Sequence, residues 1–354
     1  MKLSNAFTDR LQIKYPIIQA PMLGVSTPEM AAAVSNEGGL GSLAVGGLSP
    51  DTTRTLIRKT KSLTNKPFAV NLFAHDIPPY KDSDLEPMRE FITKLAMKRG
   101  YQLNASDLTN FTLYTYSSQI SVLIKEKVNI ISFTFGCPDP NSIKTFKDNG
   151  CLLIGTATCL QEALILQDQQ VDMIIAQGIE AGGHRGTFVD NIPLPHVGLI
   201  SLLSQMNERI KVPCIAAGGI NNGRSIKAAL DLGAVAAQIG TAFINSNESD
   251  AILSYKQRIT QSIDTDSSLT RAFSGRWARG IRNTLMNEIE NAKILIPPYP
   301  LQNSLTSKLR KLAQQNNDSE YTNLWSGQSC RPQQFTTTRD ILLDLVNQCV
   351  ELNS

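Results

Sequence analysis

The chain has 354 residues, of which 42% are hydrophobic and 18% charged. These values are ordinary for a globular protein with a sizeable core, and the length suits one large domain with an accessory unit, or two domains. The formal net charge is +3 and the basic residues are dispersed, so the composition does not indicate a nucleic-acid-binding protein. No run of about eighteen apolar residues is present, and we therefore expect no membrane-spanning segment.

The cysteines, the histidines and the N-terminal segment bear on compartment and metal binding. No two of the six cysteines form a C-x-x-C pair, which argues against a zinc site or a redox dithiol. The three histidines are not clustered. The segment MKLSNAFTDRLQIKYP has no apolar core of signal-peptide length. We therefore expect a cytoplasmic protein with reduced thiols and no metal site.

Eight short apolar runs follow one another along the chain, each bounded by glycine, proline or polar residues. Runs of this kind are typical of strands that are buried on both faces in a parallel sheet. They cover residues 15–22, 40–47, 67–74, 129–136, 151–158, 172–178, 212–219 and 234–243.

Helix candidates separate these runs. The first begins at Thr27-Pro28-Glu29, where a cap residue is followed by a proline in the first turn. Strands that alternate with helices predict a (β/α)8 TIM barrel, which typically takes about 250 residues. The rival is an open doubly wound sheet, which usually carries G-x-G-x-x-G after its first strand, whereas the first strand here ends in QAPMLG. The remaining helices are expected at 50–62, 117–126, 140–148, 160–169, 196–208 and 221–232.

Two segments interrupt the alternation. Residues 75–115 form an excursion after the third strand, with a helical stretch at 85–99. Residues 251–333 are expected to form a smaller, mostly helical accessory region over the barrel mouth. We therefore predict three parts. A barrel covers residues 1–250 and contains the excursion, and the accessory region covers 251–333. A C-terminal helix over 334–354 packs back on the barrel.

Polar side chains and glycines stand where the predicted strands end. The active site of a TIM barrel lies at the C-terminal ends of its strands. Asn71, Gln177 and Gln238 need polar partners there, either one another or a ligand ring that carries amide groups. Strands seven and eight end in Gly218-Gly219 and Gly240-Thr241, ahead of helices, which is the usual phosphate cradle of such barrels.

The stretch QGIEAGGHRG, residues 177–186, places four glycines beside a histidine at the end of the sixth predicted strand. The simple interpretation is a glycine-rich turn with a surface histidine. The alternative is a cofactor site in which His184 reaches the reactive edge of a flat ligand. Gly182 and Gly183 would let the backbone pass close to such a ligand, as a Cβ would not, so Gly182→Val is expected to lose the cofactor while the barrel stays folded.

Several motifs occur together and in a fixed order over nearly the whole chain: YPIIQAPM, NLFA, SFTFGCP, LIGTAT, AQGIEAGGHRGTF, VPCIAAGGI and AAQIGTAF. With them the chain resembles the nitronate monooxygenases, formerly called 2-nitropropane dioxygenases. AFSGRWARGI, YPLQNSLT and LWSGQS are similar to the class I branch. Residues 75–116 match only loosely, and Trp277 stands where the family often has a small residue or proline.

The resemblance implies an FMN-dependent enzyme that oxidises alkyl nitronates with O2 to the carbonyl compound and nitrite or nitrate, without NAD(P)H or a metal. It implies propionate 3-nitronate as the substrate and detoxification as the role. The family's catalytic histidine falls on His184, which would stabilise the nitronate anion or act as a base toward a nitroalkane. The weaker candidates for lining the substrate pocket are Tyr114, Tyr116, Tyr299 and Lys308. The residues that fall on the family's FMN contacts are Met22, Asn71, Gln177, Gly182, Gly219, Gln238, Ile239, Gly240 and Thr241.

Two other functions stay open at this point. Flavin-dependent enoyl reductases of fatty-acid synthesis share the EAGGH turn and the barrel but need NAD(P)H, and the class I motifs argue against them. A flavin-binding protein without turnover is distinguished only by an activity assay. In each case we expect a small-molecule ligand and no nucleic-acid or membrane partner, and the sequence does not predict an oligomeric state.

Overall fold

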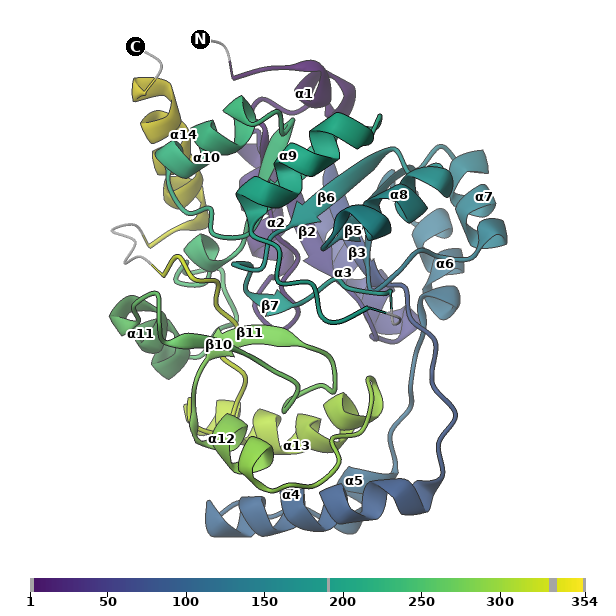
Figure 1. Cartoon of the computed structure of the whole chain (residues 1–354), viewed down its shortest axis with the longest axis vertical. Helices are drawn as coiled ribbons and strands as arrows, with labels where there is room; N and C mark the ends of the chain where they lie inside the picture. Colours follow the sequence, from purple (N-terminus) through teal and green to yellow (C-terminus); the bar gives the residue numbers. More distant parts are fainter. Residues whose placement is uncertain (1–2, 190–191, 331–335, 353–354) are drawn as a thin grey trace.

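Eight parallel strands form the centre of the protein, whose computed structural model describes residues 3–189, 192–330 and 336–352. They pair in the order β1-β9-β8-β6-β5-β4-β3-β2. Ile18 of β1 also bridges Leu40, just before β2, so the two edges of the sheet meet and the sheet is nearly closed. The predicted (β/α)8 barrel is confirmed (Figure 1). The strands are β1 (Ile17–Gln19), β2 (Gly41–Ala44), β3 (Phe68–Phe73), β4 (Ile130–Thr134), β5 (Leu152–Ala157), β6 (Met173–Gln177), β8 (Cys214–Ala217) and β9 (Ala236–Ile239).

Each predicted helix between the strands is present, and local capping explains where several of them begin. The side chains of Thr27, Ser49 and Asp139 accept hydrogen bonds from first-turn backbone N–H groups, and each is followed by a proline. The helices that surround the barrel are α2 (Pro28–Asn36), α3 (Pro50–Leu63), α6 (Tyr116–Lys125), α7 (Pro140–Asp148), α8 (Leu160–Asp168), α9 (Leu199–Arg209) and α10 (Gly223–Asp231).

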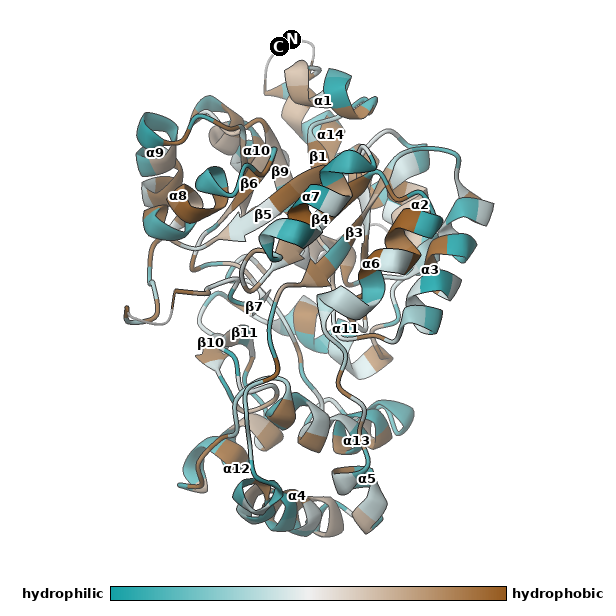
Figure 2. Cartoon of the chain, turned by 90° about the vertical axis from the view of Figure 1, so that its right-hand side faces the viewer, coloured by the Kyte–Doolittle hydropathy of each residue, from teal (hydrophilic) through white to brown (hydrophobic). Residues whose placement is uncertain are grey.

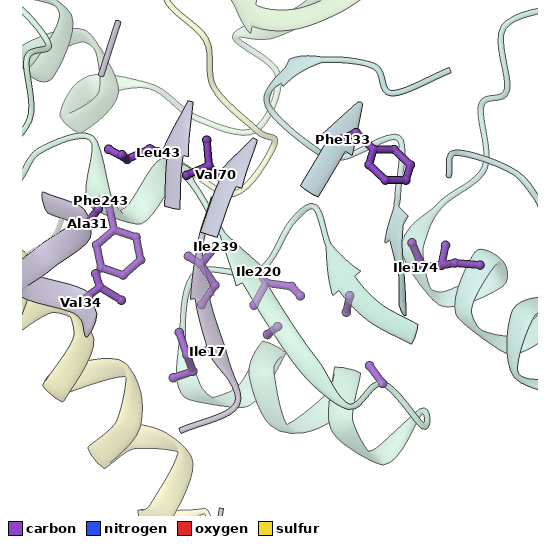
Figure 3. Close-up of a cluster of buried hydrophobic side chains, with 14 of the residues drawn as sticks. Ile17, Ala31, Val34, Leu43, Val70, Phe133, Ile174, Ile220, Ile239 and Phe243 are labelled. Carbon is purple, nitrogen blue, oxygen red and sulfur yellow. The ribbon is translucent and has the colours of Figure 1, made fainter. Parts of the chain in front are cut away.

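The main hydrophobic core lies between the strands and the surrounding helices. Branched and aromatic side chains such as Ile17, Val70, Phe133 and Ile174 are buried there (Figure 3). Figure 2 shows hydrophobic strands in the centre and hydrophilic outer faces on the helices around them. No helix in the described ranges is both long enough and apolar enough to cross a membrane.

A short N-terminal helix, α1 (Ala6–Leu11), closes the end of the barrel where the strands begin. Its Phe7 and Leu11 are buried against Ile18, Ile130 and other residues at the starts of the strands. Asn5 caps this helix and also donates from Nδ2 to the carbonyl oxygen of Val235, at the entry to β9. The barrel is therefore filled by apolar side chains at this end.

The last helix of the chain, α14 (Thr338–Glu351), takes the place of the eighth barrel helix. It packs against α2 and α10, the helices that follow the first and seventh barrel strands. Leu342 and Leu345 are fully buried, and Gln348 accepts a hydrogen bond from the backbone N–H of Gly223 at 3.0 Å. The chain thus leaves the barrel after β9 and returns about a hundred residues later.

A second hydrophobic core joins the excursion after β3 to the segment after β9. From the excursion it takes side chains of α4 (Glu86–Lys98) and α5 (Ala105–Thr109), and from the later segment those of α12 (Thr284–Asn291) and α13 (Leu301–Gln315). In Figure 1, α4 and α5 lie at the end of the molecule farthest from α14. We call this second body the accessory unit. The division of the chain at residues 250 and 333 stays a prediction.

The accessory unit also contains strands, which we did not predict for this mostly helical region. β10 (Ser267–Thr270) and β11 (Ala278–Ile281) form an antiparallel pair, and β11 pairs in turn with β7 (Gly183–His184). Between β9 and β10 lie two short helices, η2 (Thr241–Phe243) and α11 (Leu253–Gln261). In the excursion, the short helix η1 (Asp82–Leu85) precedes α4. The small sheet connects the barrel's glycine-rich turn to the accessory unit.

Leu345→Ala is expected to lower the free energy of unfolding by about 2–5 kcal/mol, because it opens a cavity between α14 and the barrel. Chemical denaturation followed by circular dichroism measures this change. Asn347→Ala, on the exposed side of the same helix, should change the stability by less than about 0.5 kcal/mol. Equal effects of the two substitutions would show that α14 does not contribute to the barrel's core.

Candidate functional site

A cavity of about 330 Å³ lies between the C-terminal ends of the barrel strands and the accessory unit. The barrel contributes residues at or just beyond the ends of β1, β3, β4, β5, β6, β8 and β9. The accessory unit contributes side chains of α13 and of residues 322–325. We call it the central cavity. The predicted site residues that line it are Met22, Asn71, Gln177, Gly182, His184, Gly219, Gln238, Gly240 and Thr241.

Ile239 is the predicted site residue whose side chain lies elsewhere. It is fully buried in the main core, among the residues in Figure 3. Its carbonyl oxygen accepts a hydrogen bond from the N–H of Ala20 at 2.8 Å. Because neighbouring residues of a strand point to opposite sides of the sheet, Gln238 faces the cavity and Ile239 faces the helices.

The two glycine turns offer backbone donors to the cavity. Gly218 and Gly219 have φ angles of +113° and +69°, which residues with a side chain rarely adopt. Within the described ranges, the N–H groups of Gly219 and Gly240 have no acceptor. The helix α10 starts four residues after Gly219, and Asn222 caps it. Free N–H groups beside a helix N-terminus suit a phosphate.

The three amide side chains at the strand ends differ in which of their atoms lack a hydrogen-bond partner within the protein. Gln177 is used internally, since its Nε2 donates to the carbonyl of His184 at 3.0 Å and its Oε1 accepts from the N–H of Gly186 at 2.8 Å. Asn71 donates from Nδ2 to the hydroxyls of Ser132 and Thr134, at 3.0 and 3.3 Å. No described residue bonds to its Oδ1, or to either end of the Gln238 amide. Asn71 and Gln238, rather than Gln177, can therefore bind the polar edge of a ring.

The glycine-rich turn is fixed from two sides. Arg185, 1% exposed, donates to the carbonyl oxygens of Gly178 and Gln177, at 2.5 and 2.9 Å, and so closes the turn from within. From the accessory unit, β11 pairs with Gly183 and His184, and the Nε of Arg279 donates to the carbonyl of Ile179 at 3.0 Å. These bonds give His184 a defined position in the cavity wall.

His184 has an aromatic and hydroxylic environment. Its Nε2 lies 2.8 Å from the hydroxyl oxygen of Ser274, and its ring centroid lies 5.4 Å from those of both Phe135 and Trp325. No described residue bonds to its Nδ1. Burial, followed by the charges of Arg276 and Arg310, lowers the pKa of His184 from 6.5 to about 3. The imidazole is therefore neutral at neutral pH and is a weaker base than an ordinary histidine.

The four weaker candidates do not line the central cavity. Tyr299 comes nearest, since its ring packs 6.2 Å from that of His184, behind the cavity wall. Tyr116 exchanges hydrogen bonds with Asp139 at the start of α7. Lys308 projects toward α5, where it forms an ion pair with Asp107 at 3.4 Å. Tyr114 is partly buried in the excursion.

The accessory unit contributes residues that we did not predict. Asn303, Arg310 and Gln314 of α13 line the cavity, as do Asn323 and Trp325 in the segment that follows. Trp325 belongs to the LWSGQS motif, which marked a family branch but no contact. Arg310 gave no signal, because an arginine on an amphipathic helix ordinarily lies on its exposed face.

Comparison with known proteins gives consistent matches over the whole chain. The sequence model of the nitronate monooxygenase family matches residues 4–348. A protein named "Probable nitronate monooxygenase" in Staphylococcus saprophyticus is 40% identical over 354 residues and 99% of each chain. The nitroalkane oxidase of Streptomyces ansochromogenes has a TM-score of 0.88 and 36% identity over 99% of both chains. FabK of Thermotoga maritima has a TM-score of 0.76 and 28% identity, over 99% of this chain and 97% of that one.

Gly182 is required by the protein itself. A Cβ on Gly182 would lie 2.5 Å from the backbone N of Gly327 and 2.5 Å from the carbonyl carbon of Ser326. This contact requires a glycine even without a bound ligand, and the close approach of a flavin to Gly182 stays a prediction. Next to it, Gly183 has a φ of +71° but open space around its missing side chain.

Gly182→Ala is therefore expected to lower the free energy of unfolding by about 1–3 kcal/mol, because the segment 326–327 must move away from the new methyl group. Thermal unfolding followed by circular dichroism measures the loss. Gly183→Asn is the control, since asparagine adopts a positive φ at less cost than most residues and no atom lies within 4 Å of the added Cβ, so it should destabilise the protein less than Gly182→Ala. If the two variants unfold at the same temperature, the close backbone contact is not what requires Gly182.

Proposed function

This chain belongs to the nitronate monooxygenase family and is a flavin-dependent oxidoreductase, and we propose that it uses FMN and O2 to oxidise alkyl nitronates, including propionate 3-nitronate. The products would be the carbonyl compound and nitrite or nitrate, and the role detoxification. The observation that carries the proposal is the position of a neutral His184 at a cavity where the N–H groups of Gly219 and Gly240, the Oδ1 of Asn71 and the amide of Gln238 have no described protein partner.

The residues of the central cavity fit FMN. The free N–H groups of Gly219 and Gly240 would hold its phosphate, and the Oδ1 of Asn71 and the amide of Gln238 would hold the polar edge of its ring. Met22 and Thr241 also line the cavity. Bound FMN would supply electron transfer between the nitronate and O2.

His184 suits an anionic substrate. When Ser274 donates its hydroxyl hydrogen to Nε2, the proton of the neutral ring is on Nδ1, which no described residue occupies. That N–H can donate to a nitronate oxygen and stabilise the negative charge. A base with a pKa of about 3 would remove a proton from a neutral nitroalkane slowly. The site therefore favours substrates that arrive already deprotonated.

Nitroalkane oxidation is the second candidate, because the Streptomyces structure is named a nitroalkane oxidase. The enoyl reductase alternative is less supported, since FabK matches with a lower identity and TM-score. A non-catalytic flavin protein would not need a polarising histidine at the cavity wall. The three alternatives differ in their substrates, so they can be separated by activity.

Purified protein is expected to be yellow, to release FMN on heating, and to consume O2 with propionate 3-nitronate in the absence of NADH. Mass spectrometry of the released flavin and an oxygen electrode provide the two measurements. Faster O2 uptake with nitroethane than with ethylnitronate would favour nitroalkane oxidation. Release of FAD, or a requirement for NADH, would contradict the proposal.

His184→Ala should retain FMN, because other residues hold the cofactor, but oxidise ethylnitronate roughly 100- to 1,000-fold more slowly, since an oriented donor is lost. Steady-state O2 uptake, normalised to bound flavin, measures the effect. His196→Ala is the control, because His196 is exposed and lies outside the central cavity. Unchanged turnover in flavin-replete His184→Ala would mean that the histidine is a turn residue only.

A further inference from the structure

Arg310 is held at the wall of the central cavity by neutral groups. Its Nε donates to the hydroxyl of Thr306 at 3.1 Å, and one nitrogen of its guanidinium donates to the Oδ1 of Asn323 at 2.7 Å. The other nitrogen donates to the carbonyl oxygen and the Oδ1 of Asn303, at 3.0 and 2.8 Å. The nitrogen that binds Asn323 has a second N–H, and no described residue accepts from it.

The charge of Arg310 has no opposite charge nearby. No described carboxylate lies within ion-pair distance of it. The buried Arg185 and Arg279 also lack an ion pair, but Arg310 alone of the three lines the central cavity. Burial lowers the pKa of this guanidinium to about 10, so the side chain still carries its charge at neutral pH. Keeping an unpaired charge in a protein wall is costly. Its retention at a cavity indicates that an anionic ligand completes the pairing.

Arg310 and His184 line the same cavity but belong to different parts of the protein. His184 belongs to the barrel's glycine-rich turn, and Arg310 to α13 of the accessory unit. The guanidinium is close enough for its charge to lower the pKa of His184. Asp250 is the only carboxylate among the described lining residues, and it is not paired with Arg310. An anion with charges at both ends could therefore meet His184 and Arg310 together.

We propose that Arg310 binds a carboxylate at the end of the substrate opposite to the nitronate group, so that the enzyme selects short nitronates that carry a carboxylate. The inference rests on the proposed function, which it makes more specific. The one guanidinium N–H that has no described acceptor can donate a charge-assisted hydrogen bond to a carboxylate oxygen, and such bonds are roughly twice as strong as bonds between neutral groups. Asn303 and Asn323 fix the direction of that N–H.

Arg310→Met, compared with the parent, tests the proposal with two nitronates that differ in one group. Propionate 3-nitronate carries the carboxylate, and propyl-1-nitronate has a methyl group in its place. For Arg310→Met we expect kcat/KM with propionate 3-nitronate to fall roughly 100-fold, because one partner of a buried charge pair is lost. With propyl-1-nitronate we expect kcat/KM to change little. The ratio of the two values cancels any difference in the amount of folded enzyme.

Two further variants serve as controls. Lys311→Met removes the same charge from the next residue of α13, where the side chain is exposed and outside the cavity, and should leave the ratio unchanged. Arg310→Lys keeps the charge without the fixed direction of the guanidinium N–H, and should recover part of the preference. Equal losses with both nitronates in Arg310→Met would overturn the proposal, because Arg310 would then serve the nitronate group or the fold. Loss of FMN from this variant would also overturn it, since the guanidinium would then hold the cofactor.

Equilibrium binding of succinate tests the carboxylate site without turnover. Succinate is an unreactive analogue in which a carboxylate replaces the nitronate group. Isothermal titration calorimetry should detect binding to the parent and to Lys311→Met, and at least tenfold weaker binding to Arg310→Met. If the parent oxidises neither nitronate but shows this pattern, the proposed function fails while the anion site stands. If the parent oxidises both nitronates but all three proteins bind succinate equally, the site assignment fails while the proposed function stands.

Discussion

The pairing of β7 with β11 is the contact on which the rest of the site depends. It joins two residues of a barrel turn to a strand that comes about a hundred residues later, and it places His184 under the accessory unit. A two-residue strand has little stability of its own, so its position relies on neighbours. Arg185 and Arg279 supply these neighbours by binding the carbonyl oxygens of the same turn. Barrel and accessory unit thus share a single cavity wall, and neither forms the site alone.

The barrel could be predicted from the sequence because its signals are local. Each strand is an apolar run, and caps such as Thr27 and Asp139 mark helix starts within a few residues. The strand-end residues could be placed for the same reason, since a barrel brings all strand ends to one face. Once Asn71, Gln177 and Gln238 were assigned to strand ends, their convergence on one cavity followed from the fold alone.

What could not be predicted depends on contacts between distant segments. Nothing local to Gly182 indicates that Ser326 and Gly327 will pass 2.5 Å from its missing Cβ. Nothing local to Gln177 indicates that both ends of its amide will be used by the turn that follows it. Arg310 resembles any solvated arginine until α13 is packed over the barrel. These residues decide which groups remain free for a ligand, so the cavity's chemistry was less predictable than its location.

The place of α14 has a consequence for biosynthesis. The barrel wall between α2 and α10 is completed by α14, so the first and seventh barrel helices keep an uncovered apolar face until residues 338–351 have been synthesised. A chain that emerges from the ribosome N-terminus first therefore cannot close its barrel before this helix has emerged. Folding intermediates would expose the surface that Leu342 and Leu345 later cover. Nascent chains that stop before residue 338 should be recognised by chaperones that bind exposed apolar surface.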